Sequence, residues 1–311
     1  MIVETARRVR ENIQKVLVSK DDVINLTLVA VLCEGHLLLE DVPGIGKTTL
    51  ARALAASLGC SFRRIQFTPD LLPSDVTGLN WFNQKEQTFE FRPGPIISQV
   101  VLADEINRAT PRTQSALLEA MQERQVTVDG VTRPLPRPFL VMATQNPVEL
   151  EGTFPLPEAQ IDRFFLRVAI GYPTQGEENA ILERFRAGDP LPDLRPVTTA
   201  EEIMRLQEAR RQVRVEASVR DYAVRVARAT RQHAEIELGA SPRATLSLYW
   251  AAQAWAALAG RDFVLPDDVK FMAPHVLTHR LMISPQAQLR GRRPEELVAD
   301  IVAAVPVPVE G

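Results

Sequence analysis

A short segment near the start of the chain carries the residue types that bind polyphosphates. The apolar residues 37–39 and Glu40 lead into Asp41-Val42-Pro43-Gly44-Ile45-Gly46-Lys47-Thr48, after which a helical pattern begins. Gly44 and Gly46 allow main-chain N–H groups to approach phosphate oxygens closely, and the helix N-terminus adds the positive end of its dipole. Lys47 is expected to reach the β and γ oxygens and Thr48 to hold Mg²⁺. The segment predicts a loop that binds a nucleoside triphosphate.

One position departs from the strict pattern GxxxxGK[ST], which has glycine where this chain has Asp41. Aspartate tolerates turn geometry better than most residues, so we expect the loop to form. The alternative is a glycine-bearing helix start with an accidental Lys-Thr pair, and the motif described next weighs against it. The expected nucleotide contacts are Asp41, Pro43, Gly44, Ile45, Gly46, Lys47, Thr48 and Thr49.

A second motif follows further along the chain. The apolar run Val100–Ala103 ends in two acids, Asp104 and Glu105. Ligands of α/β sheets bind at the carboxyl ends of the strands. Asp104 is therefore expected to order the magnesium shell and Glu105 to polarise an attacking water. Alone, such a run is equally typical of an ordinary strand end, but together with the phosphate loop it favours nucleotide hydrolysis.

The first half of the chain alternates short apolar segments with helical patterns, as parallel sheets covered by helices do. The predicted strands are His36–Glu40, Phe62–Gln66, Val100–Ala103, Phe139–Ala143 and Phe165–Ala169. Helices are expected between them, for example at Lys47–Ser57 and Thr113–Glu123. Leu79–Phe91 and Arg124–Leu135 break the alternation and predict two β-hairpins, the second with a favoured Asp129-Gly130 turn. The fold class predicted is α/β.

The composition changes after Tyr172. Residues 173–196 are rich in Pro, Gly and charge, so we place the domain junction there, with residues 1–188 as the αβα core and 189–311 as a small all-α domain. Proline suits the first turn of a helix, where its missing N–H is not needed. The predicted helices of the second domain are Ala200–Val213, Ser218–His233, Pro242–Leu258, Pro266–Leu281 and Pro294–Ala304.

The bulk composition of the 311 residues is ordinary for a globular protein, with 45 % hydrophobic and 24 % charged residues. The net charge of −3 offers no general basic field for nucleic acid or an anionic membrane. Cys33 and Cys60 lack metal or redox spacing and suit a reducing compartment. Residues 1–17 form an amphipathic helical pattern rather than a secretion signal, and the stretch Leu26–Leu39 is too short and too polar to span a bilayer. We expect a cytoplasmic protein.

The motifs, taken with their neighbours, resemble the AAA+ ATPases and, within them, the MoxR family. The resemblance covers roughly residues 15–281, nearly the whole chain. The run from Ala103 to Gly130 and the two segments after it are highly specific. The matching segments are LLLEDVPGIGKTTLARALA, LLPSDVTG, FRPGPI, ADEINRATPRTQSALLEAMQERQVTVDG, MATQNPVELEGTFPLPEAQIDRF, GYPTQGEE, SPRATLSL and VLTHRL.

This resemblance implies a P-loop AAA+ αβα core with a helical lid and ATP with Mg²⁺ bound between them. It also implies a ring, expected to be a hexamer, whose sites lie at subunit interfaces. The two predicted hairpins fall where this branch carries its helix-2 and pre-sensor-1 insertions. The implied partner is a protein with a von Willebrand factor type A domain.

Further roles are implied position by position. Asn146 matches the sensor 1 residue that positions the water, unless it only forms an Asn-Pro turn. Arg163 matches the arginine finger offered to the neighbouring subunit, with Arg108 as its rival. An ion pair of Arg163 with Asp162 or Glu158 is the structural alternative. Arg243 matches sensor 2, and its alternative is a surface arginine at a helix start.

The resemblance also implies where the base binds. Tyr172 and Pro173 match the hinge segment near the base, and residues 18–23 match the other wall of that pocket. The family usually has Gly-Gln where this chain has Ser19-Lys20, so base recognition is the part of the resemblance that transfers least directly.

Three classes of function remain open. The first and preferred one is a ring ATPase that remodels protein partners in the manner of a chaperone. The second is a nucleic-acid motor, against which the hairpin tips argue: residues 83–86 are charge-balanced, and residues 128–131 carry no stacking ring or cation cluster. The third is a nucleotide-gated scaffold with little turnover. Intact Glu105, Asn146 and Arg163 count against the scaffold, whereas Asp41 leaves it open.

Overall fold

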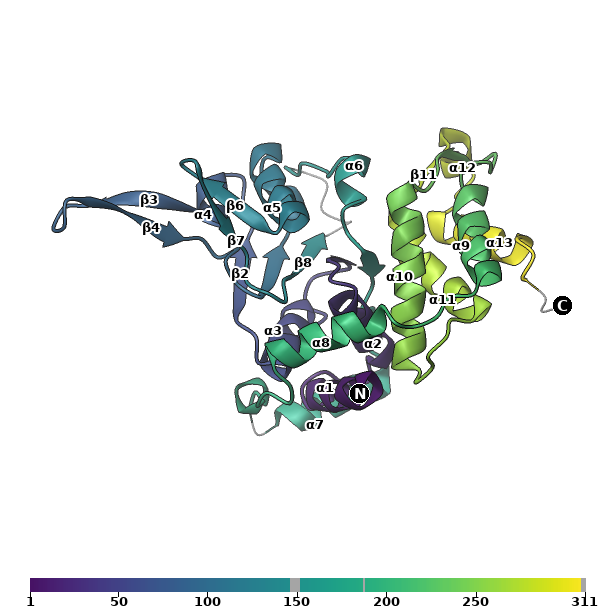
Figure 1. The fold of residues 1–311 in the computed structure, drawn as a ribbon, viewed down its shortest axis with the longest axis horizontal. Helices are drawn as coiled ribbons and strands as arrows, with labels where there is room; N and C mark the ends of the chain where they lie inside the picture. The colour runs from purple at the N-terminus through teal and green to yellow at the C-terminus, as the bar shows by residue number, and fades with distance from the viewer. Residues whose placement is uncertain (146–151, 187, 309–311) are drawn as a thin grey trace.

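A five-stranded parallel sheet forms the centre of the α/β core in the computed structural model, which describes residues 1–145, 152–186 and 188–308 (Figure 1). Its strand order is β2-β5-β8-β1-β9, so strands distant in the sequence become neighbours. The α/β fold class is confirmed, and the five strands lie within two residues of the predicted bounds. They are β1 Leu37–Glu40, β2 Phe62–Gln66, β5 Val100–Asp104, β8 Leu140–Gln145 and β9 Leu166–Val168.

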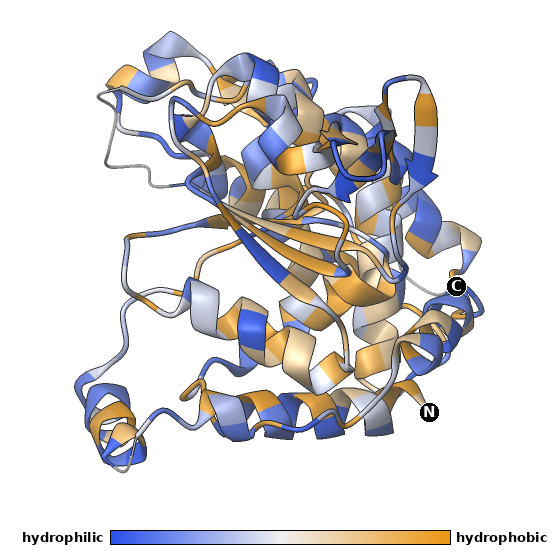
Figure 2. Cartoon of the chain, turned by 90° about the vertical axis from the view of Figure 1, so that its left-hand side faces the viewer, coloured by the Kyte–Doolittle hydropathy of each residue, from blue (hydrophilic) through white to orange (hydrophobic). Residues whose placement is uncertain are grey.

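The inner strands β1, β5 and β8 are apolar on both faces because each face packs against a helical layer. In β1, Leu37 and Leu39 contribute to one hydrophobic core and Leu38 to the other. Alternate residues of a strand point to opposite faces, so one continuous apolar run fills both cores. Figure 2 shows these largely hydrophobic strands between the helical layers.

The two faces of the sheet are covered by different helices (Figure 1). The helices of one layer are α1 Ile2–Gln14, α2 Asp21–Leu32, α3 Lys47–Leu58 and α8 Ala200–Arg210. The helices of the other layer are α4 Pro73–Thr77 and α5 Pro111–Glu123. The predicted amphipathic helix at the N-terminus is confirmed, and its apolar side packs through Val9 and Ile13 into the first core. No helix in the described part of the chain is long and apolar enough to cross a membrane.

Both predicted hairpins are confirmed. The first pairs β3 Gly78–Asn83 with β4 Thr88–Pro93 and extends far from the body of the molecule (Figure 1). The second pairs β6 Gln125–Val128 with β7 Val131–Pro134 across the Asp129-Gly130 turn. A hydrogen bond of 2.8 Å from Asn80 to the Asp129 carboxylate joins the two hairpins.

The lid is helical, as predicted. The helices that the sequence analysis began at Pro242, Pro266 and Pro294 do begin at these prolines. Its helices are α9 Ala217–Ala229, α10 Pro242–Leu258, α11 Pro266–Leu277, α12 Pro285–Leu289 and α13 Pro294–Ala304. It is not purely α-helical, however, because β10 (Ile236–Leu238) pairs antiparallel with β11 (Met282–Ile283). The predicted helix 266–281 ends at Leu277 and continues as a single 3₁₀ turn, which frees residues 282–283 for this pairing.

Helices also occupy segments to which the sequence assigned none, among them two near the junction between core and lid. The short α6 (Glu158–Ile161) precedes β9, and α7 (Gln175–Phe185) lies inside the predicted junction. Thr174 and Glu177 form a reciprocal capping box at the start of α7, with hydrogen bonds of 3.3 and 2.7 Å. The division of the chain between residues 188 and 189 stays a prediction.

Candidate functional site

The loop between β1 and α3 has a conformation that depends on its glycines. Gly44 has φ +83° and Gly46 has φ +98°, values that side-chain-bearing residues rarely adopt. A Cβ atom at Gly44 would meet nothing within 4 Å. The backbone angle, and not a lack of space, therefore restricts which residue types fit at this position. The loop ends at Lys47, the first residue of α3, whose Nζ donates a 2.5 Å hydrogen bond to the Asp41 carbonyl.

Asp41 holds the loop in place through its carboxylate. Oδ1 accepts a 2.9 Å hydrogen bond from the Val42 N–H, and Oδ2 accepts one of 2.6 Å from the Gly171 N–H. Gly171 directly precedes Tyr172, so Asp41 connects the loop to the segment after β9. The residue that departs from the strict motif therefore makes contacts that glycine could not make.

Asp104 lies at the carboxyl end of β5 between two neighbouring strands. Its Oδ1 accepts a 2.6 Å hydrogen bond from Thr144 of β8. The same threonine oxygen accepts a 2.8 Å hydrogen bond from the Glu105 N–H. Oδ2 of Asp104 pairs with Arg64 of β2 at 2.6 Å. The carboxylate that the sequence assigned to a metal shell is thus held from both sides, with an arginine as its present cationic partner.

Glu105 has an unusual backbone conformation. Its φ of +57° places a non-glycine residue in the left-handed region, a feature that is concentrated at functional sites. Its Oε2 accepts a 2.8 Å hydrogen bond from Gln66 and lies 3.3 Å from Nε of Arg108. The carboxylate is therefore oriented by side chains from β2 and from the 3₁₀ turn Ile106–Arg108.

A polar cavity of about 390 Å³ brings the two sequence motifs together. The lining residues are Pro43, Gly44, Gly46, Lys47, Thr48, Thr49, Arg64, Gln66, Asp104, Glu105 and Thr144. Burial lowers the pKa of Lys47, and the charges of Asp41, Asp104 and Glu105 oppose this shift. One ammonium, main-chain N–H groups at a helix start and a carboxylate beside a threonine hydroxyl are the groups that a triphosphate with Mg²⁺ requires. The residues present fit both ligands.

A second, mainly apolar cavity of about 390 Å³ adjoins the first and shares Pro43, Gly44, Gly46 and Thr49 with it. The expected contacts Ile45 and Tyr172 line this cavity together with Val18. The other lining residues are Val16, Leu17, Lys20, Pro173, Glu178, Ile181 and Phe185. A polar cavity beside an apolar one suits a molecule with a charged end and a flat hydrophobic end.

Several lining residues escaped the sequence analysis. Arg64, Gln66 and Thr144 lie on β2 and β8, the strands on either side of β5, and a sequence does not reveal this strand order. The alternating residues Arg64 and Gln66 at the carboxyl end of a predicted strand were the available signal. Ile181 and Phe185 belong to α7, whose signal was the capping box at Thr174.

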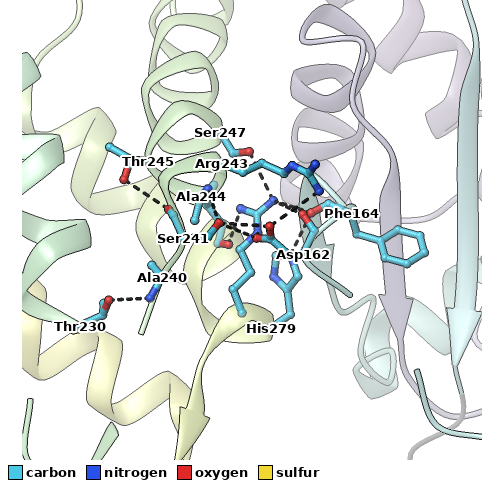
Figure 3. Close-up of polar contacts among 12 residues, drawn as sticks. Asp162, Phe164, Thr230, Ala240, Ser241, Arg243, Ala244, Thr245, Ser247 and His279 are labelled. Carbon is cyan, nitrogen blue, oxygen red and sulfur yellow. Dashed lines mark hydrogen bonds and ion pairs between the residues drawn. The ribbon is translucent and has the colours of Figure 1, made fainter. Parts of the chain in front are cut away.

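Within the part of the chain that the structure describes, the predicted site residues Asp41, Arg163 and Arg243 line neither cavity. Asn146 lies outside the described residues. Arg163 follows α6, and among the described residues its side chain makes neither of the ion pairs considered as alternatives, with Asp162 or with Glu158. Arg243 is near the start of α10, where its guanidinium lies 3.8 Å from the Asp162 carboxylate (Figure 3).

Known proteins provide an independent comparison. Residues 36–166 match the ATPase family associated with various cellular activities (AAA), and residues 228–301 match the AAA lid domain. The chain is 53 % identical to the uncharacterized protein YeaC of Bacillus subtilis, over 96 % of this chain and 94 % of YeaC. It is 42 % identical to chaperone MoxR1 of Mycobacterium tuberculosis, over 98 % of this chain and 83 % of MoxR1.

A solved structure has the same fold over almost the whole chain. The crystal structure of a proposed ATPase from Cytophaga hutchinsonii superposes with a TM-score of 0.93 and is 37 % identical, covering 99 % of this chain and 96 % of that one. The resemblance found in the sequence is confirmed by relatives of nearly full length. The chain belongs to the MoxR family of AAA ATPases.

Proposed function

We propose that the protein binds ATP with Mg²⁺ in the polar cavity and hydrolyses it. The observation that carries this proposal is the meeting of Lys47 and Thr48 with Asp104 and Glu105 around one cavity. Lys47 and Thr48 begin α3, which follows β1, whereas Asp104 and Glu105 stand at the end of β5. The sheet brings the ends of β1 and β5 to the same edge. Membership of an AAA ATPase family supports the same reading.

Each group has a role that follows from its chemistry. Lys47 and the loop N–H groups bind the β and γ phosphates, which they attract by charge. Thr48 and Asp104 would hold Mg²⁺, which supplies charge neutralisation on the phosphate oxygens when bound. Glu105 accepts a proton from the attacking water, and Gln66 keeps its carboxylate aimed.

Arg64 has to share or release Asp104 when the metal is bound, because its guanidinium now pairs with that carboxylate. The side chain is about half exposed, so such a movement meets little resistance from packing. We assign the base of ATP to the apolar cavity, where Tyr172 and Ile45 supply hydrophobic surface.

A ring of subunits, expected to be a hexamer, completes the site. Arg163 does not line its own cavity and among the described residues has no ion-pair partner, which suits a residue offered to a neighbouring subunit. Arg108 contacts Glu105 of its own subunit at 3.3 Å, and this contact supports Arg163 over Arg108 as the finger. The trans role of Arg163 implies that hydrolysis depends on assembly.

We further propose that hydrolysis remodels protein partners, among them a protein with a von Willebrand factor type A domain. The relative named as a chaperone supports this class of function. Trp81, Phe82 and Phe89 of the β3–β4 hairpin are exposed and offer apolar surface to a polypeptide. Nucleic acid remains disfavoured as a partner by the charge of the hairpin tips, and a cytoplasmic location remains a prediction.

Replacing Asp41 by glycine, which restores the strict motif, is expected to weaken ATP binding. The change removes the acceptor of two N–H groups, and hydrogen bonds to a charged group contribute about 1.5–3 kcal/mol each. We expect the Kd for ATP, measured by calorimetric titration, to rise at least about tenfold. Asp41→Asn, which keeps one acceptor, should show a smaller rise. Unchanged or tighter binding by Asp41→Gly would contradict the role assigned to this carboxylate.

Lys47→Ala tests the nucleotide site itself. Removing one partner of a buried, hydrogen-bonded charge pair costs about 2–5 kcal/mol, so the Kd for ATP should rise at least about 30-fold. ATP titration and thermal unfolding of the same samples separate binding from folding, and the unfolding midpoint is expected to change little. Lys270→Ala, which removes a lysine from the lid surface, is the matched control. Undiminished ATP affinity in Lys47→Ala would refute the phosphate-loop assignment.

A further inference from the structure

The two residues next to Arg163 in the sequence, Asp162 and Phe164, are both bound to lid residues (Figure 3). On one side, the carboxylate of Asp162 contacts Arg280, Arg243 and Ser241. On the other side, the carbonyl oxygen of Phe164 accepts hydrogen bonds of 2.6 Å from Arg280 and 3.1 Å from His279. The segment that carries Arg163 therefore takes its position from lid residues rather than from the core alone.

Arg280 makes the strongest of these contacts. Its side chain is 2 % exposed, and its Nε lies 3.0 Å from Oδ1 of Asp162 in an ion pair that lacks hydrogen-bond alignment. One terminal nitrogen donates to the Val276 carbonyl at 2.9 Å, and the other reaches the Phe164 carbonyl. A buried guanidinium needs such partners, because an uncompensated buried charge is strongly destabilising. Burial lowers the pKa of Arg280 to about 10, and the Asp162 charge opposes that shift.

The other two partners of Asp162 differ in strength. Ser241 caps α10 and donates to both carboxylate oxygens at 3.1 Å, which places the carboxylate near the positive end of that helix. Arg243 is 3.8 Å away and 48 % exposed, so its contact with Asp162 is loose. Arg243 can therefore leave Asp162 for a phosphate while Arg280 and Ser241 keep their hold.

We infer that Asp162 and Arg280 are positioning residues for Arg163: through this pair, the lid of one subunit fixes the arginine that the subunit offers to its neighbour. The inference rests on the proposed trans role of Arg163. Without the Asp162 charge, the cations of Arg280 and Arg243 repel each other, because the carboxylate that both of them contact is gone. The turn before Arg163 then loses its attachment to the lid. The defect should then appear in the neighbour's site and not in the subunit that carries the change.

Rings mixed from two inactive variants, called parents below, can show where the defect lies. It lies either in the subunit that carries the change or in the site of its neighbour. Arg163→Ala subunits keep a hydrolytic site of their own but offer no arginine, whereas Glu105→Gln subunits offer Arg163 but do not turn over. Each parent alone is expected to be nearly inactive. In an equal mixture about a quarter of the sites gain both groups, because neighbours in a ring assort at random. ATPase activity should therefore return on mixing.

Asp162→Asn is then placed in one parent at a time. In the Glu105→Gln parent, which donates Arg163, it should reduce the rescued rate at least about tenfold, since a 1 Å misplacement can cost about 10²-fold. In the Arg163→Ala parent it should leave the rescue unchanged. Ring assembly and ATP affinity of every mixture are measured alongside. If Asp162→Asn alone fails to fold, the double variant Asp162→Asn/Arg280→Gln removes both charges and is expected to show the same asymmetry.

Glu295→Gln in the donating parent is the matched control, because it breaks another core–lid ion pair, Arg167–Glu295 at 2.9 Å. It should preserve the rescue. A similar loss with Glu295→Gln, or an equal loss whichever parent carries Asp162→Asn, would overturn the inference and leave the trans finger intact. No rescue in the parental mixture would instead overturn the trans role of Arg163, and the inference with it.

Discussion

Arg163→Ala is expected to lower kcat by about 10³–10⁵, the range that an arginine finger supplies. The loss corresponds to about 4–7 kcal/mol of barrier, which is the transition-state stabilisation that the proposed finger would supply. Binding of ATP should change little, since an arginine finger stabilises charge that develops only in the transition state. Steady-state ATPase rates and ATP titrations on assembled rings measure the two quantities separately.

Dilution of the wild-type protein gives an independent check of the same residue. The proposed trans role of the finger predicts that turnover per subunit rises with protein concentration as rings assemble. Arg108→Ala is the comparison variant, and its effect should be smaller because Arg108 acts through Glu105 of its own subunit. A rate per subunit that stays flat across demonstrated ring dissociation would remove the trans assignment.

The central sheet could be predicted because its inner strands are buried on both faces, so that each is a continuous apolar run in the sequence. Val101 and Ala103 face one core while Leu102 faces the other, so the whole run is apolar and ends abruptly at Asp104. Helix starts were equally readable where proline supplies the first turn, and the predicted helices Pro242–Leu258 and Pro294–Ala304 agree with the structure at both ends.

The surroundings of the acids could not be predicted, because they depend on strand order. Arg64, Gln66 and Thr144 reach Asp104 and Glu105 only because β2 and β8 flank β5. No local pattern encodes that neighbourhood, since β5 and β8 are separated by a helix and a hairpin. Helix α7 was missed for a different reason: none of its residues is buried, so it lacks the apolar stripe by which helices are identified.

The contacts of Asp162 with the lid could not be predicted either, because the residues involved are still further apart in the sequence. Asp162 and Arg280 are 118 residues apart, and the sequence pointed to Asp162 only as a partner for its neighbour Arg163. The structure instead pairs Asp162 with three lid residues. Long-range ion pairs of this kind follow from the packing of domains, whereas the phosphate loop follows from a contiguous motif.

Glu105→Gln is expected to lower kcat by about 10²–10⁴, the usual contribution of a general base, while leaving ATP affinity unchanged. The amide has nearly the shape of the carboxylate and can still accept the hydrogen bond from Gln66, but it cannot take a proton from water. Single-turnover hydrolysis and ATP titration measure the two effects. Glu123→Gln, on the exposed end of α5, is the matched control. An unchanged rate in Glu105→Gln would favour a nucleotide-gated scaffold over an ATPase.

The same variant tests what hydrolysis is used for. A remodelling enzyme that binds ATP without cleaving it should stay in its partner-bound state, so Glu105→Gln loaded with ATP should retain a purified protein that carries a von Willebrand factor type A domain. Lys47→Ala, which should bind ATP at least about 30-fold more weakly, provides the comparison and should release that protein at ATP concentrations below its Kd. Equal retention by the two variants would mean that nucleotide does not control partner binding, and the remodelling role would then lose its coupling to the ATP cycle.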